Sequence, residues 1–466
     1  MKIRTIKELA VVLCAAGTVG CYSPYEYTSV AVDGFQYKEI QHRTLPANTH
    51  ELTLEQAIET ALANNPDFQS TEYSMKAAWA RYQQSLAAYY PRLYVSGGLN
   101  GSNSDVAKQS NFATSLNDSS SRTTSAALNV EYIIFNGLIR KMNSLAAQHL
   151  GRASDAAFDD AKRLLIKSVE LQYNQVRLIR ENISIAEADK LFQEKLLREN
   201  ELKYQAGSVS QSAVLNFRVR VNAAASKLIG ARYDLINARG VLGDLLGLTE
   251  GTIHDDVAFS TLEENVGVSL NIIEMYLDLA LNNRPDLKQY RESLKAAEYS
   301  LYAQYGAYWP VITGSGSYGA NGTTTDYTSA ENTRKTTHDL DYGVNMTWDL
   351  FSGGSRKNAV EEAKALVAQN EKNLEGQWIN VIQEVRNSFN TFKQREEQYV
   401  ILKETELLQR KNRDLVEIEY RTGSTELTRL NEAQRDLVSA ESQKISALIN
   451  LFNAKAQLEA AINAKL

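Results

Sequence analysis

The fold is decided by the stretch ALANNPDF at residues 61–68, which returns as ALNNRPDL at residues 280–287. The shift between the two stretches is 219 residues. Further along, FNG at 135–137 returns as FSG at 351–353, after 216 residues. Similarity at a nearly constant spacing indicates a repeated structural unit. The chain is therefore predicted to be a tandem duplication of a unit of roughly 200 residues, with copies at 52–248 and 272–466.

Each copy shows the same order of helical patterns. A helical stretch at about 53–90 is interrupted at Pro66, because proline disfavours helix at the residue before it. After Gly137 and after Gly354 a helical pattern runs for about 70 residues without proline, which corresponds to a rod of about 105 Å. A shorter helix then returns, and two short helices laid end to end match one long helix. The expected long helices span about 137–206 and 354–422, and the return helices span about 210–247 and 426–464.

Each copy also carries a predicted β-hairpin, at about 91–135 and about 310–351. The clearest pattern is strict alternation, in which Tyr342, Val344, Met346, Trp348 and Leu350 alternate with Gly343, Asn345, Thr347 and Asp349. Such alternation places one face of a strand in an apolar medium and the other in water. A soluble hairpin packed on a core is the alternative to a membrane strand. The polar stretch 100–124 is expected to form a long exposed loop.

Composition excludes several classes of function. The chain has 50 basic and 56 acidic residues, a formal net charge of −6 and a mean hydropathy of −0.36. A mildly acidic chain without a basic block argues against nucleic acid as a partner. His254-Asp255-Asp256 has no further residue at metal-ligand spacing, so a solvated linker is expected there. No catalytic set or phosphate-binding glycine loop is present. We therefore expect no enzyme, no metal and no cofactor.

Residues 1–20 are predicted to be a signal peptide. A positively charged start precedes a short apolar run, which is typical of export signals and too short to span a bilayer. Thr18-Val19-Gly20-Cys21 resembles a bacterial lipobox, in which Cys21 becomes the lipidated first residue. Tyr22 follows the cysteine and resembles the outer-membrane sorting pattern. Ordinary cleavage that leaves an unpaired thiol is the alternative.

The number of strands predicts an oligomer. Two hairpins give four strands per chain, and a sheet within a membrane cannot leave its edges open. Bacterial outer-membrane barrels have at least about eight strands, and a barrel that small leaves little lumen. Three chains would supply twelve strands and a wider passage. The predicted fold is therefore mainly α with a membrane β-barrel. Twelve strands and twelve full-length helical rods favour a homotrimer that closes a 12-stranded barrel.

Between about residues 52 and 462 the chain resembles the TolC-type outer-membrane efflux proteins. The resemblance rests on the doubled unit, the NNPD and NRPD turns, the Tyr-Pro and Trp-Pro strand starts, and the FNG and FSGG helix starts. It implies a trimer in which a 12-stranded β-barrel in the outer membrane continues into a long periplasmic α-helical barrel. Such a trimer is the exit duct of a tripartite efflux pump or type I secretion system. It also implies docking to a periplasmic adaptor and an inner-membrane transporter. Residues 21–51 and the linker 249–271 would form an equatorial belt.

Two other classes of protein are alternatives to an export duct. An inner-membrane-tethered periplasmic adaptor also has a helical hairpin, but it would not duplicate a membrane-patterned β-hairpin. A secreted helical surface or fibre protein would not need alternating strands with an apolar face. Both alternatives predict an assembly different from an outer-membrane trimer.

The resemblance also suggests sites at the ends of the long helices. The predicted adaptor-docking tips are Tyr204, Gly207, Ser208, Tyr420, Gly423 and Ser424. Well-studied relatives carry at the inner tip an arginine two places after the glycine and acids six and nine places after it. Here those places hold Thr425, Arg429 and Glu432, so only the last keeps its character. Glu426, Arg429 and Glu432 are a hypothetical replacement gate; an ordinary exposed ladder with i,i+3 spacing is the alternative.

The remaining expectations concern the membrane surface. Val130, Met346, Trp348 and Leu350 are expected to face lipid, whereas Asn129, Asn345 and Thr347 are expected to face the lumen. Arg140-Lys141 and Arg356-Lys357 could anchor at the inner rim of the membrane or lie on a solvated helix face. Tyr89, Tyr90, Tyr308 and Trp309 could form half of an aromatic girdle or pack in an ordinary way.

Overall fold

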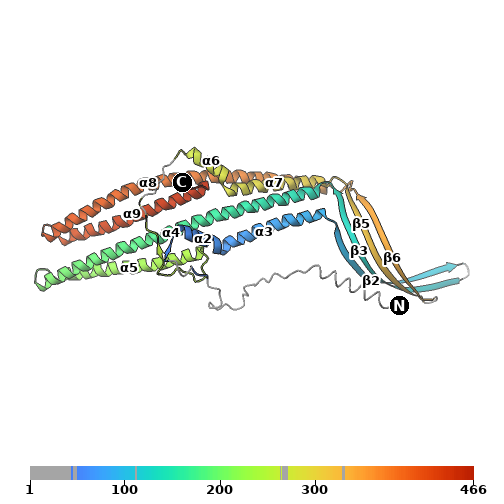
Figure 1. The fold of residues 1–466 in the computed structure, drawn as a ribbon, viewed down its shortest axis with the longest axis horizontal. Helices are drawn as coiled ribbons and strands as arrows, with labels where there is room; N and C mark the ends of the chain where they lie inside the picture. Colours follow the sequence, from blue (N-terminus) through green and yellow to red (C-terminus); the bar gives the residue numbers. More distant parts are fainter. Residues whose placement is uncertain (1–42, 46–49, 111–112, 263, 265–270, 328–330) are drawn as a thin grey trace.

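The computed structural model describes residues 43–45, 50–110, 113–262, 264, 271–327 and 331–466. The predicted signal peptide and Cys21 lie outside these residues, as does most of the segment 21–51. The described chain is elongated: long helices run side by side to two tips, and a sheet bends away at the opposite end (Figure 1). None of the helices in the described part combines the length and the apolar character needed to cross a membrane.

The helices repeat in the two copies as the duplication predicts. The first copy contains α2 (Leu54–Asn64), α3 (Pro66–Leu86), α4 (Ile139–Gln205) and α5 (Gln211–Leu245). The second contains α6 (Ile273–Asn283), α7 (Pro285–Gly306), α8 (Ser355–Arg421) and α9 (Leu427–Ile462). The two long helices, α4 and α8, have 67 residues each, which makes them about 100 Å long. All four long and return helices begin and end within two residues of the bounds expected from the sequence.

Asn65 and Pro66 together stabilise the turn between α2 and α3. Asn65 ends α2 and also caps α3, because its side-chain oxygen accepts a hydrogen bond from the backbone N–H of Phe68 at 2.9 Å. Pro66 occupies the first position of α3, where its missing N–H costs nothing. The break in the helical pattern therefore falls where the sequence predicts it.

The short helices of each copy meet end to end. In the first copy, the Asn65 side-chain nitrogen donates to the carbonyl oxygen of Leu245 at 3.0 Å, so α5 stops where α3 starts. In the second copy, the Asn463 side chain donates to the carbonyl oxygen of Asn283 at 3.0 Å. Consequently α4 lies between α3 and α7 near the sheet and between α5 and α9 near the tips (Figure 1). The helices form one layer with α8 at one margin and α3 with α5 at the other.

The sheet joins the two hairpins in one antiparallel surface. Its strands are β2 (Arg92–Ser110), β3 (Ala113–Asn136), β5 (Val311–Tyr327) and β6 (Thr333–Thr347), in the order β2-β3-β5-β6. β3 pairs with β5, with one irregularity between Ile133 and Phe135. β2 and β6 are therefore the two edges of this sheet.

Two expectations about the hairpins are wrong. The polar stretch 100–124 is mostly strand, because β2 and β3 stay paired from Arg92–Glu131 out to Ser110–Ala113. Serine and threonine fit a strand that meets water on both faces, so this stretch lacks the alternation used to detect strands. At the other end, β6 stops at Thr347 rather than near residue 351. Trp348 and Leu350 follow the strand, and the Trp348 indole N–H donates to the carbonyl oxygen of Tyr308 at 3.1 Å.

Each copy has its own apolar core near the middle of the long helices. In the first copy, β1 (Glu51–Leu52) pairs in parallel with β4 (Ala258–Phe259) of the linker. The buried Tyr173 hydroxyl donates to the carbonyl oxygen of Leu52 at 2.8 Å and fastens β1 to α4. The second core is centred on Val385 and Phe392, which correspond by position to Val169 and Val176 of the first. The cores fix the register of the long helices relative to the sheet and the tips.

Candidate functional site

The described residues show surfaces rather than a catalytic pocket. Nowhere in the described ranges do three or more histidine, cysteine, aspartate or glutamate side chains gather in a way that could hold a metal ion. The features that remain are the two faces of the sheet, the junction between the sheet and the helices, the helix tips and one groove between helices.

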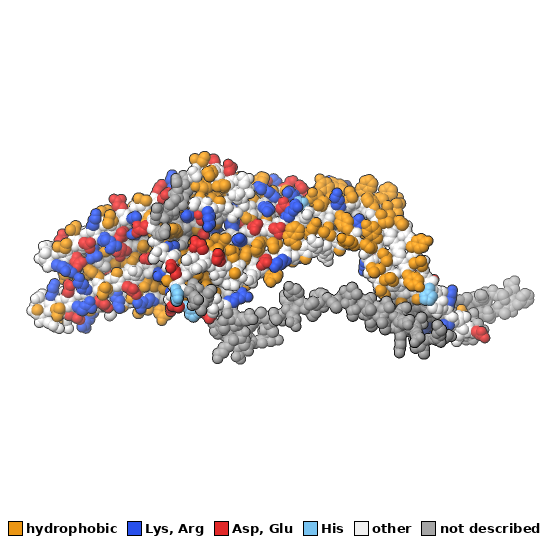
Figure 2. Space-filling model, viewed as in Figure 1, with side chains coloured by type: hydrophobic (Ala, Val, Ile, Leu, Met, Phe, Trp, Pro, Cys, Tyr) orange, Lys and Arg blue, Asp and Glu red, His pale blue; other side chains and the backbone are white. Residues whose placement is uncertain are grey.

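One face of the sheet is apolar, and no other part of the described chain covers it. The strand register places Leu93, Val130, Gly316 and Tyr342 in one row, and the next row contains Val95, Leu128, Tyr318 and Leu340. Tyr342 is 86% exposed and Leu340 is 69% exposed. Figure 2 shows hydrophobic side chains gathered over the sheet. We refer to this surface as the apolar face; a patch of this kind marks a surface that contacts a membrane or another protein.

The opposite face of the sheet is polar. The row next to Val130 contains Tyr94, Asn129, Ser317 and Asp341, and Asn129 donates a hydrogen bond to the Ser96 hydroxyl at 2.9 Å. Val130 and Met346 thus lie on the apolar face, whereas Asn129, Asn345 and Thr347 lie on the polar face. The structure separates these residues as the alternation predicts, although Trp348 and Leu350 lie beyond the strand.

Arginines at the junction of helices and sheet are bonded within the chain. Arg140 donates to the carbonyl oxygens of Ala88 at 3.0 Å and Ile133 at 2.8 Å, and its guanidinium lies 4.4 Å from the Tyr89 ring. Arg356 repeats this arrangement in the second copy. It donates to the carbonyl oxygen of Ala307 at 3.3 Å and lies 5.1 Å from the Tyr308 ring. Both arginines therefore pin the start of a long helix to the end of the preceding short one.

Aromatic side chains surround the same junction. Tyr90 and Trp309 are mostly exposed and stand immediately before the strands begin. Trp348 is also exposed and follows the last strand. These positions suit the aromatic girdle expected at a membrane boundary.

The two helix tips are tight turns that require glycine. Gly207 and Gly423 both have a φ of +76°, a conformation that a residue with a side chain adopts at a cost. Tyr204 and Ser208 are exposed at the first tip. At the second tip the Tyr420 hydroxyl donates to the Asn200 side chain at 3.4 Å. A small apolar cluster, which includes Leu196, Phe217 and Leu430, joins the helical hairpin of α4 and α5 to that of α8 and α9 just behind the tips.

The proposed gate residues are exposed and weakly connected within one chain. Arg429 Nη1 lies 3.8 Å from Glu432 Oε2, and both side chains are about half exposed. Glu426 is the residue before α9, and its side chain makes no capping hydrogen bond. A single long ion pair at an exposed site contributes little to stability. Within the described residues, the side-chain contact among these three residues is this one ion pair.

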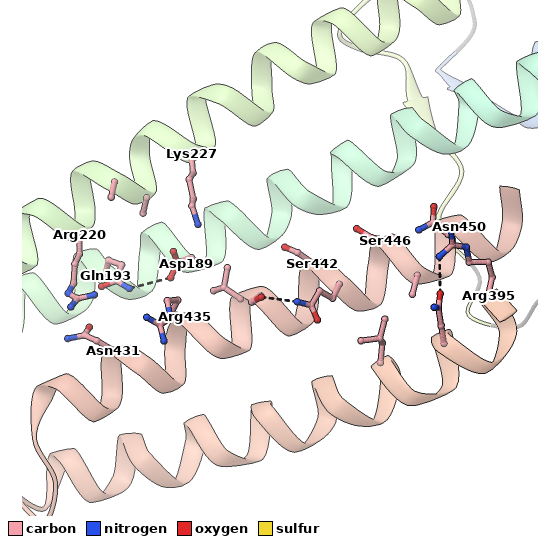
Figure 3. A pocket seen from close by; sticks show the side chains of 18 residues that line it. Asp189, Gln193, Arg220, Lys227, Arg395, Asn431, Arg435, Ser442, Ser446 and Asn450 are labelled. Carbon is pink, nitrogen blue, oxygen red and sulfur yellow. Dashed lines mark hydrogen bonds between the residues drawn. The ribbon is translucent and has the colours of Figure 1, made fainter. Parts of the chain in front are cut away.

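A groove of about 860 Å³ lies between the two helical hairpins, and sequence patterns did not reveal it (Figure 3). Four cationic side chains line it: Arg220, Lys227, Arg395 and Arg435. The single carboxylate among the lining residues, Asp189, accepts hydrogen bonds from Gln193 at 3.3 Å and Gln434 at 3.1 Å. The groove is therefore basic, although the whole chain is acidic.

The described part of the linker is fastened to the second copy by one carboxylate. Glu264 lies 2.7 Å from the Lys403 ammonium of α8 and 2.9 Å from the Lys444 ammonium of α9. These hydrogen bonds lower the pKa of Glu264 to about 2. The two ammonium groups thus favour the ionised form of Glu264, and this carboxylate links the described part of the linker to α8 and α9.

Comparison with known proteins gives a consistent result. The family model described as "Outer membrane efflux protein" matches residues 57–248 and 276–464. Nodulation protein T of Rhizobium leguminosarum bv. trifolii is 23% identical and aligns with 82% of this chain and 79% of its own length. The alkaline protease secretion protein AprF of Pseudomonas aeruginosa is 23% identical over 71% of this chain and 67% of its own.

Solved structures share the fold. The outer-membrane channel OprN superposes with a TM-score of 0.73 at 19% identity, over 92% of this chain and 98% of that one. CusC, described as undergoing conformational changes that accompany folding and transmembrane channel formation, gives a TM-score of 0.72 at 19% identity. That alignment covers 93% of this chain and 97% of CusC.

Proposed function

The chain belongs to the outer membrane efflux protein family, so it is an export channel of the outer membrane rather than an enzyme, and we propose that three copies form one closed duct. The observation that carries this proposal is the pair of open sheet edges, β2 and β6. An apolar sheet cannot leave backbone groups unpaired inside a membrane. Pairing β6 of one copy with β2 of the next closes the sheet, and three copies supply twelve strands. Val130 and Met346 then face lipid.

The helices support the same assembly. α5 lies at one margin of the layer and exposes Val219, Ile229 and Tyr233. α8 lies at the other margin and exposes Ile401, Leu408 and Ile418. Two apolar margins on opposite sides of a chain fit a head-to-tail ring in which α8 of one copy packs against α5 of the next. The ring continues the barrel as a helical tube into the periplasm.

The far end of the tube is the proposed docking region. We place a periplasmic adaptor at Tyr204, Gly207 and Ser208 of one tip and at Tyr420, Gly423 and Ser424 of the other. The basic groove behind the tips favours acidic side chains on that adaptor. An inner-membrane transporter then delivers the cargo. We infer secreted proteins as one class of cargo, because AprF is named for alkaline protease secretion.

The oligomer can be tested directly. Outer membranes are extracted with mild detergent, and the particle mass is measured by light scattering with detergent correction. We expect about three times the 52.0 kDa of one chain, and ion-conducting pores after transfer to planar bilayers. A monomer that needs no detergent for solubility would contradict the proposal.

Lipidation of Cys21 is a separate proposal. The Cys21→Ser variant should lose fatty-acid labelling, because the thiol is the acylated group in a lipobox. Trimer formation should persist, since the barrel itself anchors the chain in the membrane. Metabolic labelling with a fatty-acid analogue, followed by gel analysis, measures both. Label that remains on the Cys21→Ser chain would show that the lipid is attached elsewhere, and a wild-type chain without label would show that Cys21 is not acylated.

The gate hypothesis predicts a change in conductance. If Arg429 contacts Glu426 or Glu432 of a neighbouring tip, threefold symmetry repeats the contact three times and favours a closed mouth. The Arg429→Glu variant should then raise single-channel conductance in planar bilayers while the trimer remains intact. Lys411→Glu makes the same charge change on α8 outside the gate and should leave conductance unchanged. Wild-type conductance in both Arg429→Glu and Glu432→Lys would contradict the gate hypothesis. Glu426, Arg429 and Glu432 would then be an ordinary exposed ladder of charged side chains.

A further inference from the structure

Two arginines lie in the same row, two strands apart, at the far end of the apolar face. The register aligns Gly101, Arg122, Thr324 and Arg334 in a single row across β2, β3, β5 and β6. Counting by twos along β3 and β6 places Arg122 on the same face as Val130, and Arg334 on the same face as Met346. Both side chains therefore point outward. In Figure 2 the hydrophobic side chains over the sheet give way at this end to polar and charged ones.

Their height places these arginines at the outer boundary of the membrane. Arg334 precedes Met346 by twelve residues along β6, a distance of about 41 Å at 3.4 Å per residue. With a tilt of about 40°, this corresponds to about 31 Å across the bilayer, slightly more than an apolar band of about 25 Å. Trp348 and Arg356 mark the opposite, periplasmic boundary. The row of Arg122 and Arg334 therefore lies at the level of the outer-leaflet headgroups.

Neither arginine has a partner in the described part of the chain. No hydrogen bond or ion pair joins Arg122 or Arg334 to any described residue, whereas Arg140 and Arg356 at the inner boundary are bonded to carbonyl oxygens. A carboxylate on the same face, Asp326, lies one row further out and is bonded to neither. The two guanidinium groups thus add positive charge to a lipid-facing surface without internal compensation.

We propose that Arg122 and Arg334 bind the phosphate groups of an outer-leaflet lipid. Guanidinium groups bind phosphate through two parallel hydrogen bonds, and a nearby apolar surface accommodates the lipid chains. The two arginines are two strands apart, or about 9.6 Å between backbones, so they can share one phosphate or hold two. The inference rests on the barrel orientation proposed above. It adds a specific lipid contact to that orientation.

The test measures lipid retention by the full-length channel. The purified channel is incubated in detergent with bis-phosphorylated lipid A, with the same lipid after phosphate removal, or with inorganic phosphate alone. Bound ligand is then quantified by native mass spectrometry. We expect the Arg122→Gln/Arg334→Gln variant to retain at least tenfold less phosphorylated lipid than the wild-type chain. Arg122→Lys/Arg334→Lys should lose part of the binding, because it keeps the charge without the planar guanidinium.

Lys335→Gln is the matched control. It removes one positive charge from the residue next to Arg334, but on the polar face, and should retain lipid as the wild-type chain does. The inference would be overturned if the double glutamine variant retained as much lipid as the wild-type chain. It would also be overturned if the wild-type chain bound the dephosphorylated lipid as well as the phosphorylated one, or if Lys335→Gln lost as much lipid as the double glutamine variant. If inorganic phosphate binds as tightly as the phosphorylated lipid, the two arginines form a general anion site and the lipid proposal is wrong. Trimer mass is recorded for every sample, so failure of the proposed assembly is seen separately.

Discussion

A lysine at Val130 is expected to remove most of the trimer from the membrane, whereas a lysine at the adjacent Asn129 leaves its yield nearly unchanged. Val130 lies on the apolar face in the row with Leu93 and Tyr342, near the middle of the apolar band. A lysine at the centre of the lipid-facing surface costs about 2–4 kcal/mol in a membrane barrel. Three copies raise the cost to about 6–12 kcal/mol per trimer. Asn129 lies on the polar face, where water solvates the new ammonium group.

The cost of a lysine should fall from the middle of the apolar band toward the membrane boundary, which gives the experiment an internal scale. Met346 is the second-last residue of β6 and lies close to the aromatic residues at the periplasmic boundary. Met346→Lys should therefore cost less than Val130→Lys, since a lysine near the boundary can extend to the headgroups. Asn345→Lys is its control on the polar face. Trimer yield is measured by gel migration without boiling. Equal yields from Val130→Lys and Asn129→Lys would show that the faces are wrongly assigned.

Loss of Arg284 is expected to destabilise the second copy strongly. Arg284 is buried at the junction of α7 with α9. It binds Asp286 through two hydrogen bonds, of 3.0 and 2.7 Å, and donates to Glu384 and to the carbonyl oxygen of Ala461. Removing one partner of a buried ion pair costs about 3–5 kcal/mol, because the other charge stays buried without compensation. We expect the Arg284→Ala variant to lose this much free energy of unfolding.

The first copy supplies the matched control for Arg284. Asn65 occupies the corresponding junction and binds it with neutral hydrogen bonds, so Asn65→Ala should cost only about 0.5–2 kcal/mol. A double variant, Arg284→Met with Asp286→Leu, should recover much of the loss, because the buried Asp286 charge is removed together with its partner. Glu384 loses its partner too, but its side chain is 39% exposed and water can solvate it. Denaturant unfolding followed by helical circular dichroism measures all three. Similar costs for Arg284→Ala and Asn65→Ala would argue against an ionic origin of the effect.

Acid should weaken the same junction. Burial by itself would raise the pKa of Asp286, but hydrogen bonds from Arg284 and Gln377 hold that pKa below its usual value. A carboxyl group with a lowered pKa stabilises the fold above its unfolded-state pKa, and this stabilisation is lost as the pH falls through the lowered pKa. The difference between the wild-type chain and Arg284→Ala should therefore shrink in strong acid.

Sequence patterns predicted the elements that have a regular hydrophobic period and that end at proline or glycine. Long helices without proline, ended by Gly207 and Gly423, could be bounded to within two residues. The outer half of the first hairpin could not be predicted, because serine and threonine on both faces of a strand give no alternation. The end of β6 was also missed, since Trp348 continues the apolar alternation while its indole is bonded to the end of α7.

The candidate sites divide in the same way. The alternation of apolar and polar residues predicts the face of the sheet on which Val130 and Asn129 lie. The glycines at the turns predict the positions of the helix tips. The basic groove combines side chains from four helices that are far apart in sequence, so no local pattern reveals it. Glu264 is equally hidden, because its partners Lys403 and Lys444 lie on two helices with many other charges. Tertiary contacts, rather than residue type, distinguish these groups from their neighbours.

The end-to-end meeting of the short helices has a consequence for how the chain folds after export. The hydrogen bonds from Asn65 to Leu245 and from Asn463 to Asn283 each close a loop of 180 residues. Contacts of such long sequence separation form slowly, because chain entropy is lost before any of them can contribute. The first loop can close before the second copy has emerged, since both of its ends belong to the first copy. We therefore expect folding in order from the N-terminus, with a half-folded intermediate whose β3 lacks its partner β5 and needs protection from aggregation.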